Sequence, residues 1–402
     1  MLLRDFLEII SIFREIMEPT AHIERRALMV ASPRVYREWT AVEEAHQLLQ
    51  QQGITVVETL PVHLLDGKPP LARNWQASGI DQVIAAGGDG TIGAVATHIA
   101  SSGLLLGILP LGTSNDFARS LHLPMGLREA CQTIAEGRLL TVDVGCAQPA
   151  LTAPYGLRTI QERHSVPETP EDQRPLHAFF AHALTLGLNV NFARLATSAT
   201  MRQRFGPLTY PVAALNTLSN AQPMKFTLTF QGPACSLSPE EVESEVEPDL
   251  PYHYEALQVA IINSPLFGGH FSFALAGVEM SDHLLDILIV EHFDPRQLLE
   301  AARAVLKADK HGWREANSAR FPGIRHVRAR QITIETDEPV DVTLDGELRG
   351  RTPIVVTSVA RALQVFVPEH TLTEEPDDVA ELDEAAALDE TAAPNEAAEL
   401  IG

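Results

Sequence analysis

The sequence predicts an α/β domain followed by a β-rich domain, and two observations support this fold class. Between residues 26 and 110, short apolar runs alternate with segments of helical periodicity, which is typical of a parallel sheet with helices on both faces. From residue 179 onward, β-branched and alternating runs recur at 226–230, 256–262, 331–335 and 340–344, and these predict an antiparallel β domain. A chain of 402 residues is long enough for two domains.

The first half contains apolar runs at residues 26–31, 54–57, 82–86 and 104–110, which predict buried strands. Helical periodicity covers residues 39–52 and the segment that follows residue 91, and a further strand at 139–146 leaves this domain. In parallel sheets, ligands bind at the carboxyl ends of the strands. The turns after residues 86 and 110 are therefore expected to form a site.

The first of these turns has the sequence Gly-Gly-Asp-Gly-Thr at residues 87–91. Glycines let a phosphate approach the backbone closely, and the N-terminus of the next helix offers unpaired N–H donors and a positive dipole end. Asp89 would repel a phosphate, so its natural partner is a Mg²⁺ ion shared with a nucleotide. Gly-Gly alone would be typical of an ordinary strand–helix turn, but the whole string favours nucleotide binding.

The second turn, at residues 110–119, reads Pro-Leu-Gly-Thr-Ser-Asn-Asp-Phe-Ala-Arg. Its short polar residues suit turns and helix caps, and they can also hydrogen-bond a phosphate or a ribose. Alone this turn predicts a capped helix start; beside the first turn it predicts a shared nucleotide site. A third motif, Asp-Gly-Glu at residues 345–347, follows a strand and by itself predicts a hairpin turn.

Composition excludes several function classes. The formal net charge is −23, and residues 369–402 hold twelve acids with no Lys or Arg, which predicts an acidic disordered tail. Such acidity argues against a nucleic-acid partner. Three scattered cysteines predict neither disulfides nor a zinc site and fit a cytoplasmic protein. No apolar run is long enough to span a membrane, and no zinc-protease or P-loop string is present.

Residues 2–17, within a predicted N-terminal amphipathic helix at 1–24, carry a broad apolar face. Two interpretations remain open: the helix docks on its own protein or on a homodimer mate, or it lies peripherally at the inner membrane face. Arg4 and Arg14 are the only cations on its polar face, which favours docking.

In this order, the three motifs resemble those of the diacylglycerol kinase catalytic-domain family, which includes soluble bacterial lipid kinases and, more distantly, sphingosine and ceramide kinases. The resemblance runs from residue 25 to residue 368. It implies a phosphofructokinase-like α/β ATP-binding domain at 25–145, rejoined by a last strand at 356–368. A β-sandwich-like lipid domain would occupy 146–355, with insertions near 148–175 and 236–249.

The resemblance also implies an activity: ATP-dependent transfer of the γ-phosphoryl group to the hydroxyl of diacylglycerol or a related lipid at the membrane surface. Asp345 would be the general base. Asp282 would bind a structural Mg²⁺ ion, with Glu347 reached through water. The residues expected to contact ATP are Gly87, Gly88, Asp89, Gly90, Thr91, Gly112, Thr113, Asn115 and Asp116.

The chain departs from the family pattern at three places. Ser32 precedes Pro33 where the family has Asn-Pro, Asn189 replaces the carboxylate of a Gly-Phe-Asp-like segment, and His283 follows Asp282 where glycine is usual. Two alternatives therefore stay open: NAD kinase-like phosphorylation of a soluble hydroxyl substrate, and a catalytically silent lipid-binding regulator.

Overall fold

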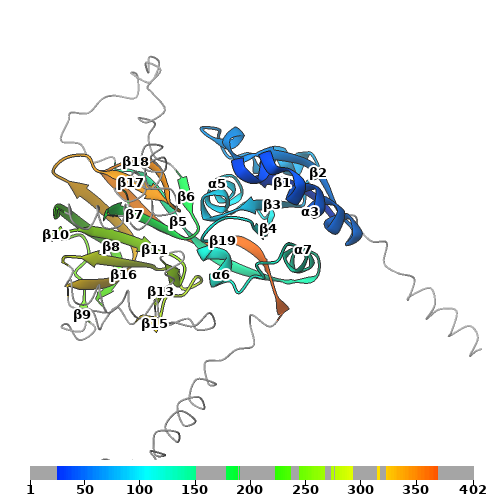
Figure 1. Cartoon of the computed structure of the whole chain (residues 1–402). Helices are drawn as coiled ribbons and strands as arrows, with labels where there is room; N and C mark the ends of the chain where they lie inside the picture. Colours follow the sequence, from blue (N-terminus) through cyan, green and yellow to red (C-terminus); the bar gives the residue numbers. More distant parts are fainter. Residues whose placement is uncertain are drawn as a thin grey trace, which may run out of the picture.

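The computed structural model describes residues 25–150, 178–188, 190, 222–236, 244–267, 273–275, 277–292, 315–316 and 323–369. Within these residues, an α/β half and a β-rich half lie side by side (Figure 1). Several predicted features lie outside the described residues: the helix at 1–24, nearly all of the insertion at 148–175, Asn189, and the tail from residue 370.

The α/β half is built on a parallel sheet whose strands lie in the order β2-β1-β3-β4-β19. The bounds are β1 (Arg25–Ala31), β2 (Ile54–Pro61), β3 (Gln82–Gly87), β4 (Leu105–Pro110) and β19 (Ile354–Val367). Every residue of β3 is buried. A strand covered on both faces needs an uninterrupted apolar run, which is why residues 83–86 are apolar without alternation.

Helices cover both faces of this sheet and form a separate core on each. They are α2 (Pro33–Glu38), α3 (Thr40–Gln51), the 3₁₀ turn η1 (Val62–Leu65), α4 (Ala72–Ala77), α5 (Asp89–Ile99), α6 (Asp116–Ser120) and α7 (Leu127–Glu136). The helix predicted at 39–52 is α3, and α2 precedes it. Ser32 and Pro33 begin α2, and the positive φ of Trp39, 43°, separates the two helices.

The β-rich half continues the same sheet from β19 through β16, β14, β11, β7, β17 and β18. The remaining strands are β5 (Arg138–Pro149), β6 (Ala178–Phe180), β7 (Ala183–Gly187), β8 (Met224–Ser236), β9 (Ser244–Glu245), β10 (Pro251–Ala256), β11 (Gln258–Ile262), β12 (Leu266–Phe267), β13 (Phe273–Leu275), β14 (Leu285–Val290), β15 (Glu315–Ala316), β16 (Ile324–Thr336), β17 (Asp341–Leu344) and β18 (Glu347–Arg351). Strands β12, β13 and β15 form a separate sheet. The run at 256–262, expected as one strand, is divided at Leu257 because β10 pairs with β8 whereas β11 pairs with β7 and β14.

Strand β19 connects the two halves. Its first residues, Ile354 and Val356, pack into the β-rich core, whereas Leu363, Val365 and Val367 pack into the α/β core. The change of core coincides with an irregularity in its pairing with β5 and with a positive φ of 52° at Arg361. Strand β19 therefore belongs to both cores.

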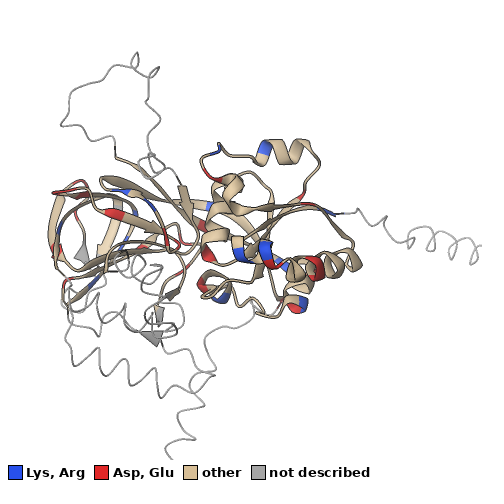
Figure 2. Ribbon diagram, turned by 45° about the horizontal axis from the view of Figure 1, so that its top comes forward, with Lys and Arg blue, Asp and Glu red and all other residues tan. Residues whose placement is uncertain are grey.

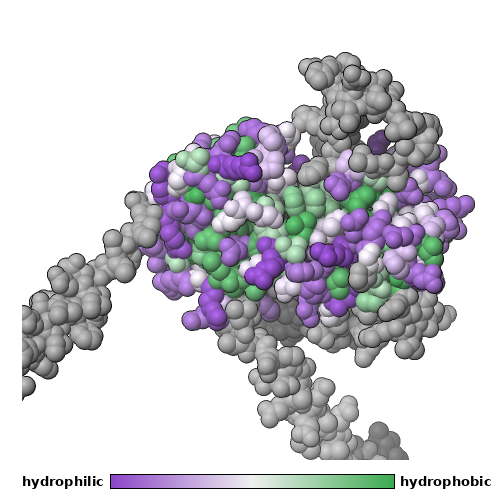
Figure 3. Space-filling view, turned by 180° about the vertical axis from the view of Figure 1, so that it is seen from behind, coloured by the Kyte–Doolittle hydropathy of each residue, from purple (hydrophilic) through white to green (hydrophobic). Residues whose placement is uncertain are grey.

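The surface is mixed in character. Positive and negative residues are interspersed along the ribbon (Figure 2), and the face in Figure 3 interleaves hydrophobic with hydrophilic residues. None of the described helices is both long enough and apolar enough to cross a membrane.

Candidate active site

The two glycine-containing turns lie against each other at the carboxyl ends of β3 and β4. Gly87 pairs with Pro110, and the Leu111 N–H donates to the Gly87 carbonyl at 3.1 Å. A methyl group added to Gly112 would lie 2.3 Å from the Gly88 Cα. Glycine is therefore required here for close backbone approach, and the two turns are in direct contact.

The second turn is braced from inside by Asn115. This residue has a positive φ of 53° and is 6% exposed. Its Oδ1 accepts the Gly112 N–H at 3.0 Å, and its Nδ2 donates to the Pro110 carbonyl at 3.0 Å. The Asn115 side chain thus holds the turn in shape, whereas Thr113 is exposed at its tip.

Asp89 connects the first turn to the second. It opens α5, and its carboxylate accepts the N–H groups of Asp116 at 3.1 Å and Phe117 at 2.9 Å. A carboxylate at this position accepts hydrogen bonds from the unpaired N–H groups of α6 and interacts favourably with the positive end of its dipole. Asp89 is therefore engaged in capping α6, and its expected Mg²⁺ contact stays a prediction. Thr91, two residues further along α5, is buried beneath Gly87.

Asp345 lies beside α5, although it follows Asp89 by more than 250 residues. It is 9% exposed, has a φ of 47°, and follows β17. Its carboxylate accepts the N–H groups of Ala181 at 3.0 Å and of His182 and Ala183, both at 2.9 Å. A methyl group added to Gly93 of α5 would lie 2.3 Å from Asp345 Oδ2. The Asp-Gly-Glu motif thus meets the helix that begins at the first turn.

Burial sets the protonation of this carboxyl. Desolvation raises the pKa of Asp345 to about 6, against the opposing effects of His182 and the backbone N–H donors. Because those donors stabilise the anion, a buried carboxylate can still be ionised at neutral pH. Asp345 therefore has the location and the protonation range of a general base.

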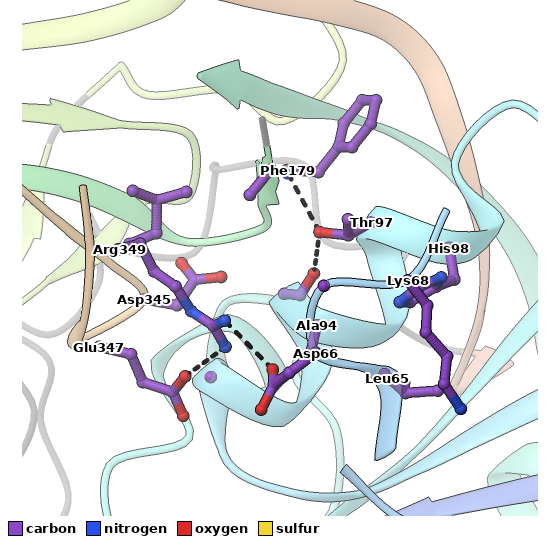
Figure 4. A pocket seen from close by; sticks show the side chains of 15 residues that line it. Leu65, Asp66, Lys68, Ala94, Thr97, His98, Phe179, Asp345, Glu347 and Arg349 are labelled. Atoms are coloured by element: carbon purple, nitrogen blue, oxygen red, sulfur yellow. Dashed lines mark hydrogen bonds and ion pairs between the residues drawn. The ribbon is translucent and has the colours of Figure 1, made fainter. Parts of the chain in front are cut away.

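Asp345 lines a pocket of about 130 Å³ between α5, the loop after η1, β6 and the β17–β18 hairpin (Figure 4). Glu347 and Arg349 line it from β18, and Asp66 and Lys68 line it from the loop. Arg349 contacts Glu347 at 2.6 Å and Asp66 at 3.2 Å. The pocket thus combines carboxylates and cations from both halves.

Sequence reasoning missed His182, which is 7% exposed. Its backbone N–H donates to Asp345, its Nδ1 lies 2.7 Å from Ser264 Oγ, and its Nε2 lies 3.6 Å from Asp116 Oδ2. Asp116 belongs to the second turn, so His182 joins that turn to Asp345. A lone histidine in an apolar run carries no sequence signal for such a contact.

The two expected metal ligands each contact an arginine. Asp282 Oδ2 lies 3.3 Å from an Arg328 nitrogen and its Oδ1 accepts the Leu284 N–H, whereas Glu347 contacts Arg349. Each carboxylate is already in an ion pair, Asp282 with Arg328 and Glu347 with Arg349. No three His, Cys, Asp or Glu side chains of the described residues are placed to hold a metal ion. The metal-binding roles of Asp282 and Glu347 stay a prediction.

The loop around Asp282 nevertheless keeps a glycine-like conformation. His283, where the family usually has glycine, has a positive φ of 65°, a region that favours glycine. Its N–H donates to Asp143 Oδ2 at 2.7 Å. This buried carboxylate also accepts the Arg361 N–H at 2.7 Å, so it anchors the loop to β19.

Comparison with known proteins finds two family models that match successive parts of the chain. The diacylglycerol kinase catalytic domain model matches residues 36–147, and the YegS C-terminal NAD kinase beta sandwich-like domain model matches residues 183–367. The diacylglycerol kinase of Mycobacterium tuberculosis is 26% identical over 336 residues, 82% of this chain and 91% of that protein. The diacylglycerol kinase of Staphylococcus saprophyticus is 23% identical over 312 residues, 77% of this chain and 84% of that protein.

A crystal structure of a Bacillus anthracis protein, assigned as a diacylglycerol kinase, shares the fold. Its TM-score is 0.57 at 21% sequence identity, with 89% of this chain and 99% of that chain covered. The two family models lie on the two halves that meet at the pocket. The chain therefore belongs to the diacylglycerol kinase catalytic-domain family and is a kinase.

Proposed function

We propose that the protein is an ATP-dependent lipid kinase that transfers the γ-phosphoryl group to the hydroxyl of diacylglycerol or a related lipid. One observation carries the proposal. The Asp345 carboxylate lies against α5, whose N-terminus forms the first glycine-rich turn, in a pocket shared by both halves. A base and an anion-binding turn in one crevice are what phosphoryl transfer to an alcohol requires.

The nucleotide side of the site is the pair of turns. Gly88 and Gly112 let the backbones of the two turns approach each other closely, and the first turn of α5 offers N–H donors to the β- and γ-phosphates. Thr113 is exposed at the tip of the second turn, where it can reach the nucleotide. Asn115 and Asp89 act by shaping the turns.

The acceptor side is the pocket beside Asp345. The Asp345 carboxylate accepts the proton of the lipid hydroxyl as the oxygen attacks the γ-phosphorus, and ADP leaves as the bond between the γ-phosphorus and the bridging oxygen breaks. Three backbone N–H donors fix its orientation, so little rearrangement is needed during transfer. Mg²⁺ accompanying ATP supplies charge neutralisation on the phosphate oxygens.

A phosphorylation assay with a lipid panel tests this proposal. The protein, γ-labelled ATP and Mg²⁺ are incubated with micelles of diacylglycerol, of other lipid alcohols, or with NAD in solution. We expect label in an organic-extractable lipid phosphate. Label in NAD alone would instead establish a kinase of a soluble substrate. Lipid binding without label transfer to any acceptor would contradict the proposal and favour a silent lipid-binding regulator.

A further inference from the structure

Arg349 lies at the mouth of the pocket, and no sequence motif singles it out. It belongs to β18, two residues beyond Glu347, and its side chain is 33% exposed. One guanidinium nitrogen contacts Glu347 Oε2 at 2.6 Å, and another contacts Asp66 Oδ1 at 3.2 Å (Figure 4). Asp66 belongs to the loop after η1, in the α/β half. Arg349 thus bridges the two halves across the pocket.

Glu347, the partner of Arg349 within the β17–β18 hairpin, lies against the first glycine-rich turn. A methyl group added to Gly90, in the first turn of α5, would lie 2.7 Å from Glu347 Oε1. The positive end of the α5 dipole favours a carboxylate there. The nucleotide phosphates are expected at the same end of α5, so the position of Glu347 affects where those phosphates bind. Arg349 is the side chain that holds this carboxylate.

Stability does not explain the bridge. The Asp66 and Glu347 side chains are 50% and 49% exposed, and ion pairs that water reaches contribute little to folding stability. Both carboxylates raise the pKa of Arg349 and outweigh the opposing effect of burial, so the guanidinium is charged throughout the working range. Its planar fork can engage two carboxylates in fixed directions, which a lysine ammonium cannot do.

We propose that Arg349 is a positioning residue for phosphoryl transfer: by bridging Asp66 and Glu347, it holds the Asp-Gly-Glu hairpin against the first turn of α5. The inference rests on the proposed kinase function. Arg349 acts through Glu347, whose hairpin also carries Asp345. Displacing a reacting group by about 1 Å can cost on the order of 100-fold in rate, so a modest shift of the hairpin would be visible in turnover.

The test compares two arginines of the same strand. Arg351 contacts Asp341 at 2.6 Å within the hairpin and is 58% exposed, so Arg351→Ala removes an arginine from β18 without touching the pocket. For Arg349→Ala we expect kcat to fall by about 10- to 100-fold, with an unchanged thermal midpoint. Arg349→Lys should lie between Arg349→Ala and the wild type. Arg351→Ala should keep the wild-type kcat.

Asp66→Asn breaks the same bridge from the α/β half and gives a second measurement if Arg349→Ala folds poorly. It should lower kcat in the wild-type background and have little further effect in Arg349→Ala. A kcat of Arg349→Ala within twofold of the wild type, or equal losses in Arg349→Ala and Arg351→Ala, would overturn the inference alone. A wild type inactive on every lipid would overturn the proposed function and the inference with it.

Discussion

At the scale of single residues, the site depends on a buried carboxylate that must carry a charge. Asp345 is almost completely removed from water, which disfavours the anion. Three backbone N–H groups of residues 181–183 point at it and partly offset that cost. The chain thus raises the basicity of the carboxylate without neutralising it at physiological pH.

This balance predicts a pH dependence of turnover. Burial raises the pKa of Asp345 to about 6, and a general base must be ionised to accept a proton. We expect kcat for lipid phosphorylation to fall as the pH is lowered through about 6, because the carboxyl becomes protonated. The measurement is kcat between pH 5 and 8 at saturating ATP. A kcat that stays constant down to pH 5 would argue against this assignment.

Residue types in a motif could be predicted from the sequence, but contacts between motifs could not. The Asp-Gly-Glu string pointed to Asp345. His182 and Arg349 act only because Asp116 and Asp66 meet them in space, across intervals of 66 and 283 residues. The capping of α6 by the Asp89 carboxylate is another such contact between motifs, and the expected contact of Asp89 with Mg²⁺ stays a prediction.

At the scale of elements, the site depends on how closely two turns approach each other. The buried strands β3 and β4 were predictable because uninterrupted apolar runs are typical of parallel sheets. The division at Leu257 was not predictable, because one apolar run serves two strands with different partners. The adjacency of the turns follows from the register that pairs Gly87 with Pro110.

Adding side chains to these turns should weaken nucleotide binding in a graded way. A methyl group on Gly112 would lie 2.3 Å from the Gly88 Cα, whereas one on Gly88 would lie 3.2 Å from the Gly112 Cα. We expect Gly112→Ala to raise the Kd for ATP more than Gly88→Ala does, because backbone must move to admit it. Calorimetric titration with ATP measures both. Equal affinities in both variants and the wild type would contradict the close approach.

At the scale of the whole molecule, β19 joins the strands of the two halves into one continuous sheet. Its early residues pack into the β-rich core and its late residues into the α/β core. The family resemblance implied a returning last strand, and β19 pairs with β4 in parallel. Because the crevice is formed where the halves meet, its geometry depends on this shared strand.

A shared strand predicts cooperative unfolding. Val356 is fully buried in β19, so Val356→Ala should cost about 2 kcal/mol of unfolding free energy. Val57→Ala, at a residue 41% exposed, serves as the control and should change the unfolding free energy by less than about 0.5 kcal/mol. In urea, hydrogen exchange should report one transition for both halves. Two separate transitions, with only one shifted by Val356→Ala, would show that the halves fold independently.

The central claim is that Asp345 accepts the proton of the acceptor hydroxyl beside the two glycine-containing turns. The most direct measurement is label transfer from ATP to lipid by Asp345→Ala, with ATP affinity and thermal unfolding measured on the same sample. We predict that transfer is lost while ATP binding and folding persist, because Asp345 contacts β7 and α5 and does not form the turns. Transfer at close to the wild-type rate would contradict the account.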